Sequence, residues 1–317
     1  MVTKRVFRNR EEWLQYRMGA PMIGGSDVGT IMGQNPYCTP FQYWMQKKQE
    51  MQGTAEEERN ANQSRGIFKE EAIARMFEEV TGEKIIRRSA QIEVYKNDRF
   101  PAYMQVAPDR EVFSHGRGRR IGVEVKDTKL FIPALTSETM PKMWFTQIQF
   151  CMGIMERDQW YIACEEGGKN FVYQLFDFNA TLFDYIVDYC SAWFERYILG
   201  DEIPPAETGA DAALLWPVAE TKPVDVPLAM ADVVAELRDK KKEKAAIEKE
   251  ITALEDQIKV AFREGDQMIC NGSVLATYKN ATMTRIDAEA LKRDYPEVAM
   301  KVSKSVTFRK LSLSKTK

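Results

Sequence analysis

Two carboxylates and a lysine lie close together in the sequence: Asp109 in the segment VAPDR (106–110), and Glu124 and Lys126 in the segment GVEVK (122–126). The second segment predicts a strand. Side chains alternate along a strand, so Glu124 and Lys126 are expected on one face. Asp109 belongs to the turn region before that strand, where it can come alongside. We therefore expect the three side chains to converge on one point.

This set of side chains suits phosphodiester hydrolysis. Hard oxygen ligands favour Mg²⁺ or Mn²⁺, which keep several waters and also bind substrate phosphate. Such an ion lowers the pKa of bound water and offsets charge on the attacked phosphate. Lys126 would orient or help to deprotonate that water, or stabilise the developing charge. An E-x-K pair alone is common on solvent-facing strands, and the Pro-Asp turn upstream is what makes this one a candidate site.

The composition is that of a soluble globular protein. The chain has 317 residues, of which 44% are hydrophobic and 29% charged. It has no apolar run of the roughly 18 residues that a membrane span needs, and its N-terminus has no signal-peptide core, so a cytoplasmic protein without membrane contact is expected. A formal charge of −2 argues against non-specific coating of DNA but allows a local basic channel.

Cysteine and histidine usage narrows the chemistry. The five cysteines form no CxxC pair, which argues against a zinc ribbon or an iron–sulfur cluster. A histidine-based zinc site or a Ser-His-Asp triad would depend on the single histidine, His115. Catalysis, if present, is expected to use carboxylates and lysine.

The pattern along the chain predicts an α/β protein in three parts: a domain at 1–200, a proline-rich linker or strap at 201–227, and a helical arm with a small α+β region at 228–317. Helices are expected at 10–17, from Ser26 or Asp27 as N-cap, at 39–46, 64–80, 140–155, 181–199, 228–264 and 287–295. Strands are expected at 89–95, 100–106, 111–113, 121–126, 159–165, 170–178, 267–278, 281–286 and 305–312.

The long helix at 228–264 carries an apolar stripe, Ile247, Ile251, Leu254 and Ile258, with coiled-coil spacing. We expect the stripe to pack on its own domain or on a sister chain. Docking of a different partner is the alternative.

Five ordered blocks carry a family resemblance: IGGSDVGTIMGQNPY (23–37) with Arg17 ahead of it, GIFKE (66–70) in a helix ending at TG (81–82), APD (107–109), GVEVK (122–126) and QIQ (147–149). Over residues 10–195 the chain resembles the lambda-exonuclease-like branch of PD-(D/E)XK nucleases, the YqaJ-type viral recombinases. The resemblance implies a restriction-endonuclease-like core, in which a mixed central sheet is flanked by helices.

The resemblance also implies residue roles. Asp109 and Glu124 would bind the metal with the Val125 carbonyl, Lys126 would be the catalytic lysine, and Glu70 would approach the metal centre, often through water. Arg17, Ser26 and Gln147 resemble the group that holds a terminal 5′ phosphate of DNA. The family's best-known member has Ser where this chain has Ala107, which puts the detail of end recognition in doubt.

Plainer roles remain open for several of these residues. Gln147 and Gln149 would sit on an exposed helix face, Arg17 on the surface, Ser26 only at a helix cap, and Glu70 in solvent. Trp144 and Phe145 are expected in the core rather than stacked on bases.

The implied activity is a Mg²⁺-dependent exonuclease, with Mn²⁺ as a substitute, that degrades linear double-stranded DNA 5′ to 3′. It would release 5′-mononucleotides and leave 3′ single-stranded tails for phage-type recombination. A single-strand annealing protein as partner, a ring-like homo-oligomer and a phage or prophage origin in a bacterial host are implied as well. The alternatives are a structure-specific or nicking endonuclease and a non-catalytic DNA-binding scaffold subunit. A Cas4-like cluster nuclease is disfavoured by the cysteine spacing.

Overall fold

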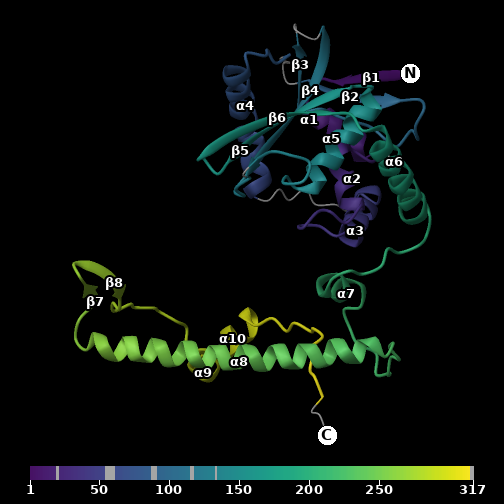
Figure 1. Cartoon of the computed structure of the whole chain (residues 1–317). Helices are drawn as coiled ribbons and strands as arrows, with labels where there is room; N and C mark the ends of the chain where they lie inside the picture. The colour runs from purple at the N-terminus through teal and green to yellow at the C-terminus, as the bar shows by residue number, and fades with distance from the viewer. Residues whose placement is uncertain (19–20, 54–60, 87–90, 115–117, 133, 315–317) are drawn as a thin grey trace. The chain divides into compact units, whose positions relative to one another are not determined.

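The computed structural model divides the chain into two compact units, Met1–Leu215 and Trp216–Lys317. It describes residues 1–317 except 19–20, 54–60, 87–90, 115–117, 133 and 315–317. His115 lies outside the described residues. Figure 1 shows the elements of both units.

A four-stranded sheet forms the centre of the first unit, in the order β3-β4-β5-β6, as far as the described residues extend. Its strands are β3 (Arg110–Ser114), β4 (Arg119–Thr128), β5 (Gln159–Glu166) and β6 (Asn170–Asp177). The pair β3–β4 is antiparallel, β4–β5 parallel and β5–β6 antiparallel. Helix α5 (Lys142–Met155) connects the parallel strands, which need a crossover.

Helices cover both faces of this sheet (Figure 1). Helix α4 (Ala61–Thr81) packs Ile73 and Phe77 against Val123 and other residues of one face. Helices α5, α6 (Ala180–Phe194) and α2 (Gly25–Ile31) pack on the other face around Ile162. The predicted α/β class, a mixed central sheet flanked by helices, is confirmed.

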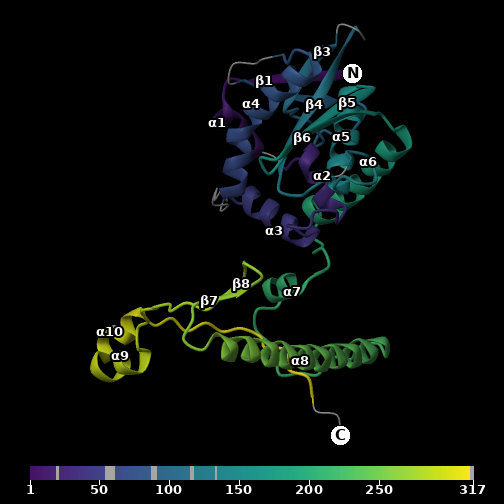
Figure 2. The same ribbon diagram turned by 60° about the vertical axis from the view of Figure 1, so that its left-hand side comes forward.

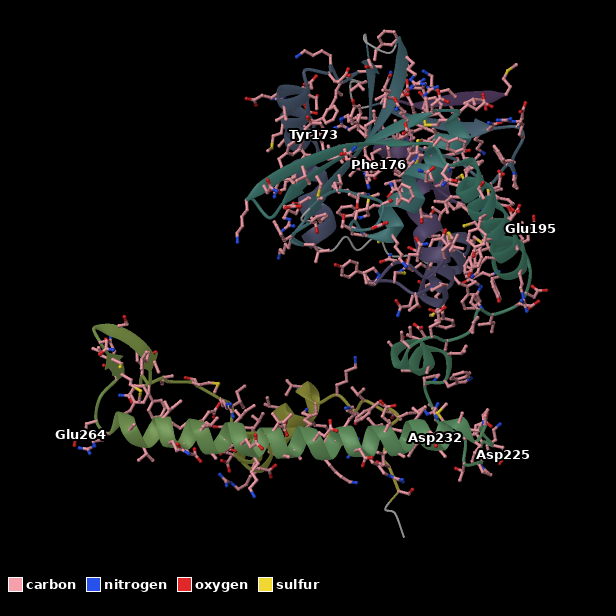
Figure 3. All side chains as sticks on the ribbon, in the orientation of Figure 1. Tyr173, Phe176, Glu195, Asp225, Asp232 and Glu264 are labelled. Atoms are coloured by element: carbon pink, nitrogen blue, oxygen red, sulfur yellow. The ribbon has the colours of Figure 1, made fainter. Side chains whose placement is uncertain are left out.

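The two faces can be followed on β6 in Figure 3. Tyr173 meets Phe77 of α4, with ring centroids 6.0 Å apart. Phe176 lies on the opposite face and meets Phe145 of α5 at 5.8 Å. Successive side chains of a strand point to opposite faces of the sheet, so each side chain of β4 likewise faces either α4 or α5.

Smaller elements complete the first unit. Strand β1 (Val2–Phe7) pairs antiparallel with β2 (Ile92–Asn97). The helices are α1 (Arg10–Met18), α3 (Pro40–Met51), a π-helical turn (Glu195–Leu199) and α7 (Gly209–Leu215). Thr39 caps α3 as predicted, since its side chain accepts a hydrogen bond from the N–H of Gln42 at 3.1 Å.

Gly122 of β4 leaves room for a large side chain of β5. A Cβ at this position would fall 2.4 Å from the indole ring of Trp160. Trp160 is the residue opposite Gly122 in the register and is fully buried. The glycine therefore leaves the space that the indole fills.

A buried carboxylate joins α7 to α3. Asp211 accepts hydrogen bonds from the side chains of Thr39, at 3.0 Å, and Gln42, at 2.9 Å. The backbone N–H groups of Glu207 and Thr208 donate to its other oxygen. These donors hold the pKa of Asp211 below its ordinary value, although burial alone would raise it.

The second unit contains the long helix α8 (Ala229–Phe262) and a small β-hairpin of β7 (Gln267–Cys270) and β8 (Ser273–Thr277) (Figure 2). Two short helices follow, α9 (Ala288–Asp294) and α10 (Pro296–Val302). Asp287 caps α9 with hydrogen bonds from two backbone N–H groups.

Several sequence predictions are wrong. Residues 100–106 form no strand, although Met104 and Val106 make single bridges to Ile23 and Tyr95 and are buried. Residues 281–286 and 305–312 also form no strand, because alternation alone does not supply a partner edge. Strand β1 and helices α7 and α10 were not predicted.

Two predictions about helices also fail. Helix α2 starts earlier than expected, because its N-cap is Gly24 and not Ser26 or Asp27; Ser26 follows inside the helix, and the Asp27 side chain accepts a hydrogen bond from the Gly24 N–H at 2.8 Å. The apolar face of α4 is narrower than expected, since Phe68 and Val80 are exposed and Ile73 and Phe77 are buried. Gly82 ends α4 with positive φ, as predicted.

In the described part of the chain, no helix is long and apolar enough to cross a membrane. Helix α8 has the length but is densely charged.

Candidate active site

Asp109 is fixed beside β4 by a main-chain contact. Its Oδ2 accepts a hydrogen bond from the backbone N–H of Val125 at 2.9 Å. The pairing of β3 with β4 begins at Arg110 and Val123, so Val125 has no partner residue on β3. Its N–H is therefore available to Asp109. The N–H and C=O of one strand residue face the same edge, so the Val125 carbonyl also faces the edge where Asp109 lies.

Glu124 lies at the centre of the site and is only 3% exposed. Its Oε1 accepts hydrogen bonds from Gln147 Nε2 at 2.6 Å and from Lys126 Nζ at 2.7 Å. Burial and the nearby carboxylate of Asp109 raise the pKa of Glu124 to about 7, against the opposing effect of Lys126. Glu124 therefore keeps its proton to a higher pH than an ordinary carboxyl group.

Lys126 shares this face of β4, as the alternation predicts. Its ammonium group also donates to Gln147 Oε1 at 3.0 Å and lies 5.8 Å from the ring centre of Trp144. Burial lowers its pKa, but attraction to Glu124 and Asp109 outweighs burial, and the net pKa is raised. Lys126 is therefore a cation at neutral pH.

Glu70 approaches from helix α4. Its carboxylate pairs with the Arg110 guanidinium, which also donates to the main-chain oxygen of Asp109 at 2.7 Å. Burial and the charge of Asp109 raise the pKa of Glu70, while Arg110 lowers it. Glu70 thus lies within electrostatic reach of Asp109 but is held by an arginine.

The donor set at this point suits a hard divalent cation that keeps most of its waters. Among the described residues, no three His, Cys, Asp or Glu side chains are close enough to form a complete metal cage. Mg²⁺ needs only one or two carboxylates beside water and substrate phosphate. Asp109, Glu124 and the Val125 carbonyl offer oxygen donors of this kind, and the pKa of Glu124 is raised by burial and by the charge of Asp109 in spite of the neighbouring Lys126.

Of the three residues expected to bind the terminal phosphate, Gln147 is the one that contacts the Glu124–Lys126 pair. It is buried, so an exposed helix face is excluded for it and for the fully buried Gln149. Gln149 bonds to the backbone of Asp177 and Asn179, a structural contact. Trp144 is in the core as predicted, with 8% exposure.

Ser26 and Arg17 show no hydrogen bond to this centre in the described residues. Ser26 is exposed in the first turn of α2. The guanidinium of Arg17 lies over the ring of Trp13, 5.0 Å from its centre. Gly25 brings the start of α2 against α5, since a Cβ there would lie 2.7 Å from Cys151 Sγ and 3.4 Å from Gln147 Cγ.

A network behind the site was not predicted. Asp127, next to Lys126, faces α4 and bonds to Arg65 at 2.7 Å and Lys69 at 3.1 Å. Lys69 also bonds to Glu165 of β5 at 2.7 Å. These ion pairs attach the helix turn that carries Glu70 to the two central strands. The acidic Asp127 directly after Lys126 is the only signal in the sequence.

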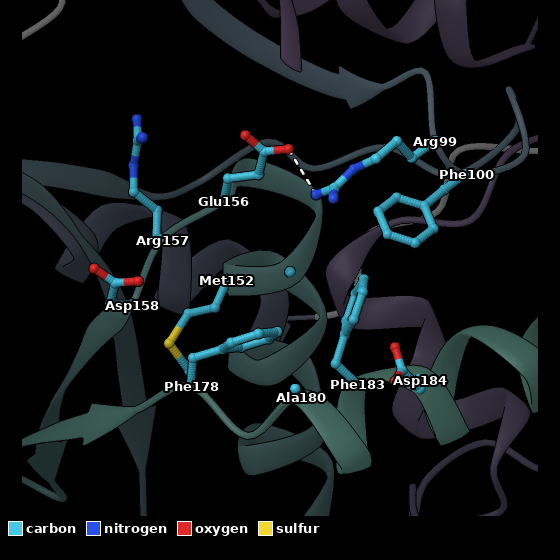
Figure 4. A pocket seen from close by; sticks show the side chains of 11 residues that line it. Arg99, Phe100, Met152, Glu156, Arg157, Asp158, Phe178, Ala180, Phe183 and Asp184 are labelled. Carbon is cyan, nitrogen blue, oxygen red and sulfur yellow. Dashed lines mark hydrogen bonds and ion pairs between the residues drawn. The ribbon is translucent and has the colours of Figure 1, made fainter. Parts of the chain in front are cut away.

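Elsewhere in this unit, a pocket of about 320 Å³ lies between the end of α5 and the start of α6 (Figure 4). Arg99 and Arg157 line it, but Arg99 pairs with Glu156 at 2.7 Å and Arg157 with Glu111 at 3.2 Å. Its aromatic wall includes Phe183. Because both arginines are paired, the pocket is a weaker candidate for phosphate than the Glu124 centre.

Comparisons with known proteins agree with the resemblance. Residues 12–158 match the family model described as the YqaJ-like viral recombinase domain. YqaJ of Bacillus subtilis strain 168, named an uncharacterized protein, is 26% identical over 323 residues, 99% of this chain and 97% of that protein. The predicted resemblance to YqaJ-type recombinases is confirmed.

Two solved structures are also similar. The alkaline exonuclease LHK-Exo from Laribacter hongkongensis has 19% identity and a TM-score of 0.48, covering 60% of this chain and 93% of its own. A phage-related exonuclease from Haemophilus somnus 129PT has 13% identity and a TM-score of 0.40, covering 56% and 95%.

Proposed function

We propose that this chain, whose residues 12–158 carry the YqaJ-like viral recombinase domain, is a metal-dependent DNA exonuclease. The observation that carries the proposal is the contact of Asp109 with the strand that bears Glu124 and Lys126. A binding module has no need for two carboxylates and a buried lysine at one point.

The residues have distinct roles in this proposal. Asp109, Glu124 and the Val125 carbonyl hold Mg²⁺, or Mn²⁺ in its place, and Glu70 approaches through water. The bound ion supplies an activated water and neutralises the attacked phosphate. Lys126 remains charged, which suits stabilisation of the developing negative charge, and Gln147 fixes the positions of Lys126 and Glu124.

The substrate we propose is the 5′ end of linear double-stranded DNA, degraded 5′ to 3′ to mononucleotides with 3′ single-stranded tails. Arg17, Ser26 and Gln147 would hold the terminal phosphate. The packing of Gly25 against Gln147 and the exposure of Ser26 support a phosphate site at the start of α2. Lack of a hydroxyl at Ala107 predicts a modest preference for the phosphate.

Wider expectations follow from the same resemblance. We propose a ring-like homo-oligomer, cooperation with a single-strand annealing protein, and a phage-type protein acting in the bacterial cytoplasm. In a ring, basic groups of a nearly neutral chain concentrate in a central channel.

The test uses linear duplex DNA labelled at either 5′ or 3′ ends, and a covalently closed circle, with and without Mg²⁺. We expect metal-dependent release of 5′ label as mononucleotide, an intact circle, and faster loss with a 5′ phosphate. Cutting of the circle would favour the endonuclease. Absence of any cleavage with Mg²⁺ or Mn²⁺ would favour the scaffold.

A further inference from the structure

Helix α8 has an apolar stripe along most of its length, exposed except at the half-buried Leu237. The C-terminal half contributes Ile247, Ile251, Leu254 and Ile258, each 45–59% exposed. The same alternation of three and four residues continues toward the N-terminus through Lys244 and Lys240 and then into a second apolar group. Figure 3 labels Asp232, in the first turn of the helix, and Glu264, just past its last residue.

The second apolar group consists of Leu237, Val233 and Met230. Met230 and Val233 are 45% and 55% exposed. The stripe thus spans about four heptads, with two lysines in its middle. An apolar seam of this length on a 34-residue helix is the pattern of a coiled coil that lacks its second helix.

Helix α8 has one basic and one acidic segment, whose charges are opposite and equal in size. Residues 238–244 (RDKKKEK) contain five basic and two acidic residues, a charge of +3, and residues 248–256 (EKEITALED) contain one basic and four acidic residues, a charge of −3. A second copy running in the opposite direction places each basic segment alongside the acidic segment of the other helix. The helix is therefore complementary to its own reversed copy.

The seam lysines select the direction. In a parallel pair, Lys240 and Lys244 would each face their own copy inside the seam, and Glu243 and Glu250 would meet Glu248 and Glu255 at its flanks. In an antiparallel pair the lysines face Ile251 and Ile247, and Lys241 meets Glu248, although Glu243 still meets Glu250. The antiparallel pair removes the lysine–lysine contacts.

We propose that α8 pairs with α8 of a second copy of this chain in an antiparallel coiled coil, with Leu254 of each copy against Leu237 of the other. The interface is isologous, so it closes as a two-fold dimer. It is independent of the nuclease chemistry and of any ring formed through the first unit.

The test is the mass of the full chain by sedimentation equilibrium. The double variant Ile251→Lys with Leu254→Lys should halve the mass, with an association constant lower by about 100-fold or more. The matched control is Val260→Lys, on the same helix but off the stripe and 77% exposed, which should keep the mass of the unmodified chain. Equal masses for the unmodified chain and the double variant would overturn the proposal.

A second double variant controls for simple unfolding of α8. Replacement of both seam lysines, Lys240→Leu with Lys244→Leu, should tighten association several-fold, because apolar residues suit the seam. Far-ultraviolet circular dichroism checks that each variant keeps its helix. Unchanged or weaker association would contradict the proposed seam.

Cysteine cross-linking tests direction, in a Cys270→Ser background. Leu254→Cys mixed with Leu237→Cys should form a disulfide between copies under mild oxidation. Leu254→Cys alone should not, because its two copies are 17 residues apart along the pair, about 25 Å at 1.5 Å per residue. Efficient cross-linking of Leu254→Cys to itself would overturn the antiparallel arrangement.

Discussion

The carboxylate of Asp109 accepts a hydrogen bond from the backbone N–H of Val125, on the strand that carries both other site residues. The contact makes the position of Asp109 depend on a main-chain group that mutation leaves in place. Side-chain charge and side-chain position can therefore be separated by experiment.

Asp109→Asn tests the charge. The amide oxygen still accepts from Val125, so we expect the free energy of unfolding to stay within about 0.5 kcal/mol. Loss of a metal ligand should reduce Mg²⁺-dependent DNA degradation by more than about 100-fold. Rate measurements and urea unfolding give both quantities. A variant as active as the unmodified chain would remove Asp109 from the metal site.

Metal binding should respond to pH through Glu124. Burial and Asp109 raise its pKa to about 7, so without metal the folded state binds a proton that the unfolded state loses near pH 4 to 5. Stability from this group is thus highest at low pH and falls as pH rises toward and through 7. Mg²⁺ competes with that proton.

We therefore expect Mg²⁺ to raise the melting temperature more at pH 8 than at pH 6. Glu124→Gln, which carries no charge at either pH, should lose most of the effect. Differential scanning calorimetry at both pH values measures it, and a metal-induced shift that is equal at both pH values would count against Glu124 as a ligand.

Gln147 and Gln149 provide a matched comparison on one helix. Gln147→Leu removes the bonds to Glu124 and Lys126, and we expect the Mg²⁺ concentration for half-maximal activity to rise about 10- to 100-fold. Gln149→Leu removes bonds to the backbone of Asp177 and Asn179. It should lower stability by about 1–3 kcal/mol and leave the metal requirement unchanged. Metal titrations of both variants decide; the reverse pattern would contradict these roles.

The network behind the site should matter for acid stability. Burial raises the pKa of Asp127, but the hydrogen bonds from Lys69 and Arg65 outweigh burial and lower it overall. Its stabilisation is present above the unfolded pKa, near 4, and is lost as pH falls through the lower folded pKa. We expect Asp127→Asn to cost about 1–2 kcal/mol at pH 7, since Arg65 and Lys69 are partly screened by solvent.

Urea unfolding of Asp127→Asn from pH 7 to pH 2 is the measurement. The difference from the unmodified chain should shrink at the acid end. A constant difference would show that the charge of Asp127 is not the cause.

Gly122→Ala tests the space that Gly122 of β4 leaves for Trp160 of β5. A methyl group would enter the indole of Trp160, and overpacking of this kind costs about 1–3 kcal/mol. Gly66→Ala, where the added Cβ meets no atom within 4 Å, is the control and should not lose stability. Equal stability of the two variants would contradict the packing argument.

The sequence predicted which side chains of β4 share a face because alternation is a local rule. It placed Glu124 and Lys126 on one face, and the turn of Asp109 beside them. It did not predict the pairing of Asp127 with Arg65, because the two residues are 62 positions apart and no periodicity links them. Residues 305–312 alternate like a strand, but alternation does not create a partner edge.

The same reasoning explains the helices. The period of α4 identified Ile73 and Phe77 as buried but not the width of the covered face, so Phe68 and Val80 were misplaced. At α2, Ser26 has the chemistry of a cap, but Gly24 takes the cap position and Asp27 satisfies its N–H.

The contacts of Asp211 have a practical consequence for production of the first unit alone. A chain ending at residue 200 would leave the Thr39 and Gln42 side chains without their shared acceptor at the start of α3. Polypeptides that stop after Leu215 keep this acceptor, so truncation should be placed there and not at residue 200.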